Sequence, residues 1–250
     1  MKAGRLKGVF EQGKFTGWQA SLLKLENHFE QARILMPLLL LIRHGENEFT
    51  RKHKLAGYTP NVHLNERGQS QAQTLAEALK EVPIKAIYSS PLERAVETAT
   101  PIAAKRGLEV QLEPGLLETN VGKWQGRSLA SLRLQKAWKV VQGTPSRAQF
   151  PEGETFYECQ TRVVAALDSM VRKYKSQDLV ACVFHADPIK LAVAHYIGLS
   201  LDHFQRLGCD TGSVTALYVS EAGANLIKLN QRPPFDFLTP PKKPKENSKA

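Results

Sequence analysis

Two short, continuously apolar runs constrain the fold of this chain more than any other feature. They are residues 38–42 (LLLLI) and 179–184 (LVACVF), and each has the length of a β-strand. A strand that is apolar at every position is buried on both faces, as in a parallel sheet that helices cover on each side. The chain is therefore expected to fold around such a sheet.

The middle of the chain alternates between strand and helix patterns. Residues 66–82 show the helical pattern most clearly, because apolar residues recur at helical spacing after Asn65, a residue type that caps helix N-termini. This alternation predicts an α/β fold, a three-layer α/β/α sandwich with a mainly parallel sheet. The other expected helices are 91–106, 129–141, 154–174 and 188–197, and the other expected strands are 84–88, 108–112, 213–219 and 225–229.

Both ends of the chain differ from this middle part. Residues 1–36 are expected to be an N-terminal extension, partly helical, unless Met36 is the true start. Residues 233–250 are rich in Pro and Lys and are expected to be a disordered basic tail, because they have too little apolar surface to offset the entropy of ordering. Residues 37–232 are left as a single expected domain.

The formal net charge of +10 does not indicate a nucleic-acid partner, because much of it sits at the two ends. Residues 1–36 have six Lys or Arg against three Glu, and residues 231–250 have five against two acids. No apolar run reaches the roughly 20 residues of a membrane-spanning helix, and no secretory signal is visible. Three widely spaced cysteines (Cys159, Cys182 and Cys209) predict reduced thiols, so a cytoplasmic protein without a membrane partner is expected.

Charged and nucleophilic side chains come shortly after four of the expected strands. The tripeptide RHG (43–45) directly follows the first apolar run, and His185 directly follows the second. Arg94 lies one turn into a helix, and Glu118 lies in a glycine-interrupted loop. Because ligands of open α/β sheets bind at the carboxyl ends of the strands, these residues are expected to gather in one site.

The motifs around these residues resemble the histidine phosphatase superfamily, which includes the phosphoglycerate mutases. In order, they are RHG (43–45), LNERG (64–68) after Gly57, SSPLERAVETA (89–99), LLETNVGKWQG (116–126), and a strand followed by His185. The resemblance extends from about residue 38 to residue 217. It implies a phosphoglycerate mutase-like fold, with residues 37–232 as the catalytic domain, and it implies no cofactor and no metal.

The resemblance also implies a role for individual residues. His44 would attack phosphorus to form a phosphohistidine, which divides one difficult displacement into two easier ones. Glu118 would protonate the leaving oxygen and then activate water. Arg43, Arg94 and His185 would hold the phosphoryl oxygens by charge-assisted hydrogen bonds. The positions implied to bind substrate are Asn47, Thr50, Ala56, Gly57 and Ala186.

Several positions depart from the family pattern. Relatives often have Ser or Thr in place of Asn47, and Asn in place of Thr50, although both replacements still hydrogen-bond. Relatives usually have Gly in place of Ala186, whose methyl group would narrow the pocket. The next residue, Asp187, is expected to cap the helix that starts at Pro188. Unless it does so or points away from the site, its negative charge would disfavour a second phosphate.

The family contains phosphatases and mutases, and the sequence favours a phosphatase. Mutases carry extra basic residues on a long insertion between the acid and the second histidine, whereas Glu118 and His185 are only 67 positions apart and residues 136–154 contain no paired arginines. Residues 129–151 are expected to form a lid, in which Trp138 and Phe150 either line the pocket or pack the helix. The expected activity is hydrolysis of a small phosphorylated metabolite by a monomer or homodimer, with a mutase as the alternative.

Two other classes of protein are weaker alternatives. A non-catalytic module that only holds a phosphorylated ligand would be expected to have lost His44, Glu118 or His185, and the chain has all three. A nucleic-acid-binding protein that acts through its basic ends would be expected to show a basic recognition helix, and neither end shows one.

Overall fold

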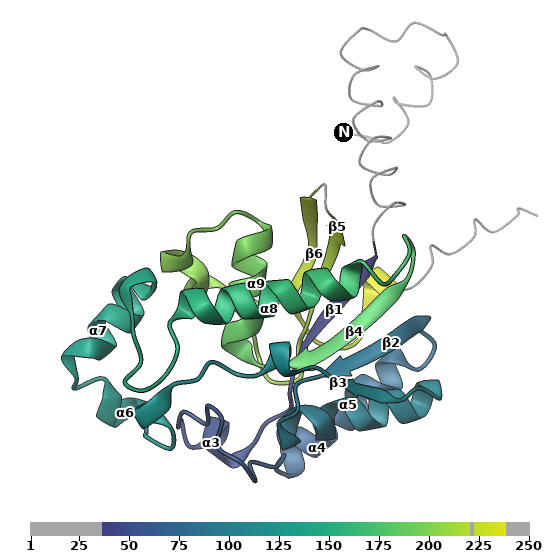
Figure 1. Cartoon of the computed structure of the whole chain (residues 1–250). Coiled ribbons are helices and arrows are strands. Elements are labelled where there is room, and N and C mark those ends of the chain that lie inside the picture. The colour runs from purple at the N-terminus through teal and green to yellow at the C-terminus, as the bar shows by residue number, and fades with distance from the viewer. Residues whose placement is uncertain (1–36, 221–222, 239–250) are drawn as a thin grey trace, which may run out of the picture.

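A six-stranded sheet forms the centre of the molecule (Figure 1). The structure is a computed structural model that describes residues 37–220 and 223–238. The strand order is β3-β2-β4-β1-β5-β6, and β5 runs against the other five strands. The strands are β1 (Leu38–Arg43), β2 (Ile84–Ser89), β3 (Val110–Leu112), β4 (Leu179–Phe184), β5 (Val214–Ser220) and β6 (Gly223–Gln231). The mainly parallel sheet predicted from the sequence is confirmed.

Helices cover both faces of this sheet, which explains why β1 and β4 are apolar throughout. On one face, Leu39 and Leu41 of β1 belong to a core that includes residues of α8 (Phe156–Val171) and α9 (Ala186–Tyr196). On the other face, Leu40 and Ile42 belong to a core that includes residues of α4 (Glu66–Leu79) and α5 (Glu93–Arg106). All four leucine and isoleucine side chains are fully buried. The three-layer sandwich is therefore confirmed.

Local capping signals fix two of these helices where the sequence placed them. The Asn65 side chain accepts a hydrogen bond from the Gly68 backbone N–H at the start of α4, at 2.9 Å. Helix α5 ends at Gly107, whose φ of 62° lies in the left-handed region that glycine adopts most easily. These two helices cover one face of the sheet, and their ends lie within three residues of the predicted limits.

The single helix expected over residues 129–141 is instead two helices, α6 (Leu129–Leu132) and α7 (Lys136–Gly143). Leu132 and Val141 are both buried in the same cluster of apolar residues. In one continuous helix, residues nine positions apart would lie on opposite faces, since each residue turns the chain by about 100°. The helix is interrupted between these two residues, which lets both side chains reach this cluster.

The first six residues of the predicted C-terminal tail are ordered in the structure. Residues 236–238 form a short 3-10 helix, and the Phe235 side chain is buried against the α4–α5 core. The prediction of disorder from residue 233 is therefore wrong for residues 233–238, because Phe235 and Phe237 supply apolar surface that this core covers. Predictions for residues 1–36 and 239–250 fall outside the described residues. No helix within the described ranges has the length and apolarity that crossing a bilayer requires.

Two glycines allow the start of α4 to lie against the chain that leaves β1. A Cβ atom on Gly45 would stand 2.6 Å from the carbonyl oxygen of Gly68. A Cβ atom on Gly68 would stand 2.0 Å from the carbonyl oxygen of Glu46. Both distances are far below van der Waals contact, so each position has room only for glycine. This contact joins the RHG and LNERG motifs physically.

We expect Gly68→Ala to lower the free energy of unfolding by about 2–3 kcal/mol, because two backbone segments must separate to admit one methyl group. The matched control is Gly143→Ala at the end of α7, where an added Cβ would meet no atom within 4 Å. This control is expected to be neutral or to gain less than about 1 kcal/mol, as Ala favours helix over Gly. Urea unfolding monitored by circular dichroism measures both variants. A Gly68→Ala protein as stable as the wild type would contradict the close contact.

Candidate active site

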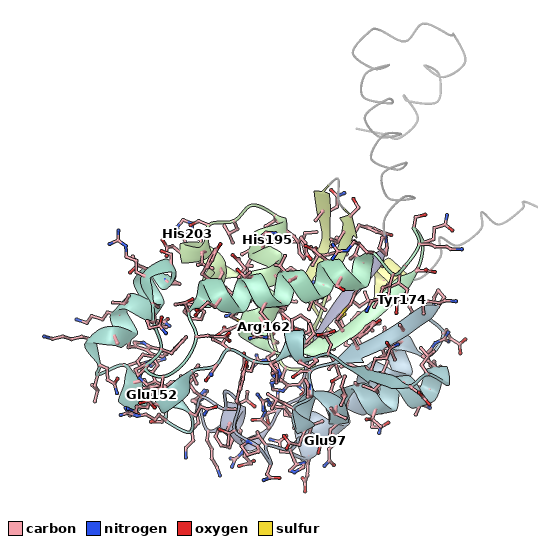
Figure 2. All side chains as sticks on the ribbon, viewed as in Figure 1. Glu97, Glu152, Arg162, Tyr174, His195 and His203 are labelled. Atoms are coloured by element: carbon pink, nitrogen blue, oxygen red, sulfur yellow. The ribbon has the colours of Figure 1, made fainter. Side chains whose placement is uncertain are left out.

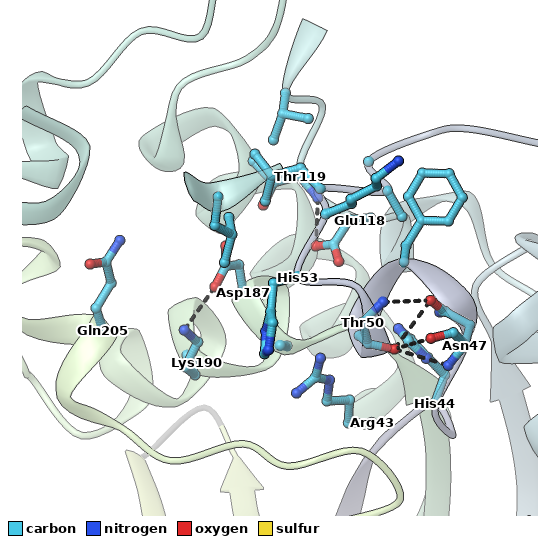
Figure 3. A pocket seen from close by; sticks show the side chains of 18 of the residues that line it. Arg43, His44, Asn47, Thr50, His53, Glu118, Thr119, Asp187, Lys190 and Gln205 are labelled. Carbon is cyan, nitrogen blue, oxygen red and sulfur yellow. Dashed lines mark hydrogen bonds and ion pairs between the residues drawn. The ribbon is translucent and has the colours of Figure 1, made fainter. Parts of the chain in front are cut away.

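The carboxyl end of β1 places an imidazole at the base of a cavity (Figure 3). The backbone N–H of His44 donates to the Phe184 carbonyl on the neighbouring strand β4, at 2.9 Å. The side-chain Nδ1 lies 2.6 Å from the carbonyl oxygen of Gly45, which can only accept a hydrogen bond. Nδ1 therefore carries a proton, and Nε2 is left with a free lone pair.

Two arginines reach the same cavity from different elements. Arg43, at the end of β1, donates through Nη1 to the Cys209 carbonyl at 2.7 Å. Arg94, in the first turn of α5, is only 1% exposed and donates through Nη2 to the Gly57 carbonyl at 2.9 Å. Arg43 Nε and Arg94 Nε and Nη1 are buried and have no hydrogen-bond partner among the described residues. Buried donors without partners are uncommon, and here they surround a site that an anion would fill.

The second histidine stands behind the first rather than in the cavity wall. The ring centroids of His185 and His44 are 5.2 Å apart. His185 Nε2 lies 2.8 Å from the hydroxyl of Ser90, while its buried Nδ1 has no hydrogen-bond partner in the described part of the chain. The Ser90 hydroxyl oxygen accepts from the Leu92 backbone N–H at 3.4 Å, and we assign its own proton to the bond with Nε2. This assignment leaves an N–H on His185 Nδ1.

The electrostatic environment keeps both imidazoles uncharged. Burial lowers the pKa of His44 well below its usual value, and the charges of Arg94 and Arg43 lower it further, against the opposing hydrogen bond to Gly45. Burial also lowers the pKa of His185, with the charge of Arg94 as the next cause. A neutral imidazole retains the lone pair that an attack on phosphorus needs, so His44 is in the reactive form at neutral pH.

Glu118 supplies a carboxyl group to the wall of the same cavity. One of its oxygens, Oε1, accepts from the Thr119 backbone N–H at 2.9 Å, and the other, Oε2, lies 3.8 Å from His185 Nδ1. Burial raises the pKa of Glu118 to about 7, helped by the negative charge of Asp187 and opposed by that of Arg94. A carboxyl group in this range gives and takes a proton near neutral pH, as an acid–base catalyst must.

The loop that carries Glu118 is fixed by a residue the sequence analysis did not identify, Arg162 on α8 (Figure 2). Its guanidinium donates to the carbonyls of Gly115, Leu117 and Glu118 at 2.9, 3.1 and 3.1 Å. It also pairs with Glu154 at 2.8 Å, and Glu154 in turn accepts from the Asn120 backbone N–H at 2.8 Å. One cation therefore holds three successive parts of this loop.

Two glycines bring the Glu154 segment close to the Glu118 loop. A Cβ atom on Gly122 would stand 2.0 Å from the Pro151 carbonyl, and one on Gly153 would stand 2.2 Å from the Asn120 carbonyl. The glycine in PEGE (151–154) was the signal in the sequence that could have identified this contact. Nothing in the sequence near Arg162 indicated its role, because the loop carbonyls that it binds are more than forty positions away and only Glu154 and Cys159, among its hydrogen-bond partners in the described residues, are close in sequence.

The structure brings nine of the ten predicted site residues to the cavity wall, with His185 buried behind it. Asn47 and Thr50 hydrogen-bond each other as the capping box of α3 (Glu48–Arg51), so much of their capacity is used there. The amide nitrogen Nδ2 of Asn47 is buried and has no partner among the described residues, which leaves it free to donate to a ligand. The remaining predicted binding residues, Ala56, Gly57 and Ala186, all line the cavity.

One expectation about the cavity wall needs correction, and one open alternative is decided. The N-cap of α9 is His185, and Asp187 lies in the first turn, where it pairs with Lys190 at 2.8 Å and lines the cavity. Asp187 is therefore not a helix cap. Of the two aromatic residues considered for the pocket, Trp138 lines the cavity, while Phe150 is buried in the apolar cluster behind it. The lid thus contributes one aromatic ring to the site.

The cavity has a volume of about 480 Å³, which is in the range of small-molecule sites. Beyond the phosphoryl site it is lined by cationic, polar and aromatic side chains from α3, the α6–α7 segment and α9. Within the described ranges, no group of three or more His, Cys, Asp or Glu side chains is placed to hold a metal ion. The site can hold an anion, attack it with an imidazole and move a proton to or from a neighbouring oxygen.

Comparison with known proteins gives a consistent picture. The profile of the histidine phosphatase superfamily (branch 1) matches residues 39–232. Phosphoserine phosphatase 1 of Hydrogenobacter thermophilus is 30% identical over 197 residues, covering 78% of this chain and 92% of that protein. The 2,3-bisphosphoglycerate-dependent phosphoglycerate mutase of Thermoplasma acidophilum is 31% identical over 190 residues, covering 74% and 88%.

Solved structures show the same fold. Phosphoserine phosphatase from Entamoeba histolytica, in complex with 3-phosphoglyceric acid, superposes with a TM-score of 0.72 at 25% identity, covering 79% of this chain and 98% of that one. A mycobacterial glucosyl-3-phosphoglycerate phosphatase in complex with VO3 superposes with a TM-score of 0.71 at 25% identity, covering 78% and 98%. The second complex holds a vanadium oxyanion, a group with the chemistry that the buried arginine donors fit.

We expect Arg94→Gln to raise the dissociation constant of inorganic phosphate by about 10- to 100-fold, the value of hydrogen bonds to a charged group. Isothermal titration calorimetry at pH 7 measures the constant, and thermal unfolding without phosphate shows whether the variant is folded. The control is Lys105→Gln, which removes a charge at the far end of the same helix and is expected to bind like the wild type. Equal affinities for wild type and Arg94→Gln would contradict a role for Arg94 in anion binding.

Proposed function

The chain belongs to the histidine phosphatase superfamily, and we propose that it hydrolyses small phosphomonoesters through a phosphohistidine formed on His44. One observation carries this proposal. The hydrogen bond from Nδ1 to Gly45 leaves Nε2 of a neutral His44 in a cavity that also holds two arginines and a carboxyl group with a pKa of about 7. These are the groups that nucleophilic transfer of a phosphoryl group requires.

In the first step, Nε2 of His44 attacks phosphorus and the bond between phosphorus and the leaving oxygen breaks. The Glu118 carboxyl gives its proton to that oxygen, so the alcohol leaves as a neutral molecule. Arg43 and Arg94 donate to the phosphoryl oxygens, and His185 donates through Nδ1. Because these donors are already fixed by bonds to the Cys209 carbonyl, the Gly57 carbonyl and Ser90, little reorganisation accompanies the reaction.

In the second step, a water molecule attacks the phosphohistidine and the bond between Nε2 and phosphorus breaks. Glu118, now a carboxylate, accepts the proton from this water and returns to its starting form. Inorganic phosphate then leaves, and His44 and Glu118 are both back in their starting states. We propose that neither step needs a metal, since the buried guanidinium groups supply the positive charge that a metal ion supplies in other phosphatases.

The names of the relatives support a small phosphorylated metabolite as the substrate. Two are phosphatases, of phosphoserine and of glucosyl-3-phosphoglycerate, and one is a phosphoglycerate mutase. A cavity of about 480 Å³ suits molecules of this size. One relative is a mutase, so transfer of a phosphoryl group between two positions of one substrate is the alternative activity. An experiment must distinguish this transfer from hydrolysis.

We expect His44→Ala to reduce phosphate release to background with p-nitrophenyl phosphate and with alkyl phosphates, because the nucleophile is absent. We expect Glu118→Gln to lower the rate with alkyl phosphates by about 10²–10⁴-fold, the usual contribution of general acid catalysis. With p-nitrophenyl phosphate, whose leaving group needs no proton, Glu118→Gln should release one equivalent in a burst and then slow, because water lacks its base.

These assays are run in excess EDTA, and a wild-type rate that EDTA leaves unchanged supports hydrolysis without a metal. Phosphate release by His44→Ala at the wild-type rate would overturn the mechanism. Phosphoglycerate isomerisation faster than phosphate release by the wild type would identify a mutase instead of a phosphatase.

We expect Asp187→Asn to move the alkaline limb of the pH–rate profile for an alkyl phosphate to lower pH. The charge of Asp187 raises the pKa of Glu118, so its removal lowers that pKa, and the protonated acid is then lost at a lower pH as the pH rises. The profile of kcat/KM between pH 5 and 9 measures the shift, with wild type and variant compared on one substrate so that titration of the phosphate cancels. A limb that stays in place or moves to higher pH would contradict this coupling.

A further inference from the structure

Helix α3 ends in a turn that ordinarily favours glycine. The Lys54 backbone N–H donates to the Phe49 carbonyl at 2.8 Å, and the His53 backbone N–H donates to the Thr50 carbonyl at 3.2 Å. This pair of bonds defines a Schellman motif, in which the residue after the helix cap adopts the left-handed conformation. His53 occupies that position with a φ of 50°. A side chain there is disfavoured because its Cβ crowds the backbone.

Nothing in the described part of the chain compensates for this conformation through the imidazole. The ring of His53 makes no hydrogen bond and no ion pair with another described residue, and the residue is exposed. Its backbone, by contrast, is fixed, because its carbonyl accepts from the Leu129 N–H at 2.8 Å and Lys54 bridges to Ser128. The turn is therefore held against the start of α6, and the direction of the side chain is set.

That direction is into the cavity. His53 lines it, and Figure 3 shows the ring directed inward, between the Asp187–Lys190 pair and Arg43 in this view. Backbone strain that no contact explains tends to occur at functional sites. The imidazole of His53 therefore lies in the cavity wall although its backbone conformation is one that glycine would adopt more easily.

The surroundings of His53 have an excess of positive charge. Lys54, Arg133 and Lys190 line the outer part of the cavity, beyond the phosphoryl site. The acid there, Asp187, is already paired with Lys190 at 2.8 Å. The charged ends of Lys54 and Arg133 have no ion pair within residues 37–220 and 223–238. The leaving group of a bound substrate therefore faces cations and an imidazole, which has an N–H donor in either protonation state.

We propose that His53, together with Lys54 and Arg133, binds a second acidic group on the leaving group of the substrate. The substrate class is then a phosphomonoester that also bears a carboxylate or a second phosphate, which share the chemistry of an oxyanion. This inference rests on the proposed hydrolysis of phosphomonoesters and adds a specificity-determining residue to it. His53 acts in substrate recognition and not in the transfer of the phosphoryl group.

The test compares substrates that differ by one acidic group. 3-Phosphoglycerate and glycerol 3-phosphate differ by a carboxylate, and glucose 1,6-bisphosphate and glucose 6-phosphate differ by a phosphate. We expect wild-type kcat/KM to favour the acidic member of at least one pair by about tenfold or more, the value of a hydrogen bond to a charged group. The pair that shows the preference identifies whether the second group is a carboxylate or a phosphate.

In His53→Gly, we expect this preference to fall to about threefold or less, mainly because KM rises for the acidic member while kcat changes little. We also expect the melting temperature to rise by about 1–3 °C, since glycine relieves the left-handed turn. A gain in stability together with a loss of selectivity separates recognition from damage to the fold. His53→Asn, which tolerates the same backbone but has a shorter side chain, should also lose the preference.

The matched control is Gln177→Gly. Gln177 also has a positive φ, 78°, in an exposed turn before β4, and it does not line the cavity. It should raise the melting temperature by a similar amount and leave the preference unchanged. A wild type that prefers neither acidic substrate, or a His53→Gly variant that keeps the preference, would overturn this inference while phosphate release dependent on His44 still supported the proposed function. A wild type that hydrolyses none of the four esters would overturn this inference, and it would overturn the proposed function as well only if p-nitrophenyl phosphate also released no phosphate.

Discussion

The site depends on a concentration of positive charge in a place that water scarcely reaches. Arg94 is almost completely buried, and among the described residues its side chain bonds only a backbone carbonyl. Burying a cation without a counterion is unfavourable, and the carboxyl group with the largest electrostatic effect on Arg94, that of Glu118, is itself pushed toward its neutral form. A phosphate dianion would supply the missing counter-charge for Arg94, and its negative charge would favour the neutral form of Glu118 further. Burial, and after it the same positive charge, lowers the pKa of His44 and of His185, so the charge that attracts an anion also helps to keep both imidazoles neutral.

Close backbone contacts then fix where these charges lie. The Gly45–Gly68 approach holds the chain after β1 against α4, and the Thr98 hydroxyl accepts from the Gly45 N–H at 3.0 Å while donating to the Arg94 carbonyl at 2.8 Å. A single threonine thus links the histidine loop to the helix that carries the arginine. On the other side, Arg162 fixes the Glu118 loop by bonds to three carbonyls. The proposed nucleophile and the proposed acid are therefore held by two independent sets of contacts.

Much of the fold could be predicted from the sequence because its signals are local, while the resemblance to a known family singled out the residues that the structure gathers around the cavity. The apolar run that RHG directly follows predicts a buried strand with a charged residue and a histidine at its carboxyl end. Asn65 and Gly107 mark the limits of two helices through hydrogen bonds to residues close in sequence. Arg162 and His53 could not be found in this way. The role of Arg162 exists only through carbonyls more than forty positions away, and that of His53 through a backbone angle and a cavity wall. Asp187 was misplaced for a similar reason, since its partner Lys190 and its effect on Glu118 depend on tertiary geometry.

Asp187 shows how one side chain can set two properties of the site in opposite directions. Its charge raises the pKa of Glu118, which favours a proton on the acid, and it neutralises Lys190, which weakens the attraction of the outer cavity for anions. Removing the charge would strengthen that attraction. It would also lower the pKa of Glu118, so that less of this carboxyl would be protonated near neutral pH. A chain that keeps Asp187 and still binds a second acidic group must obtain its attraction from cations that Asp187 does not pair with. Lys54 and Arg133 are such cations, and His53 lies with them in the cavity wall.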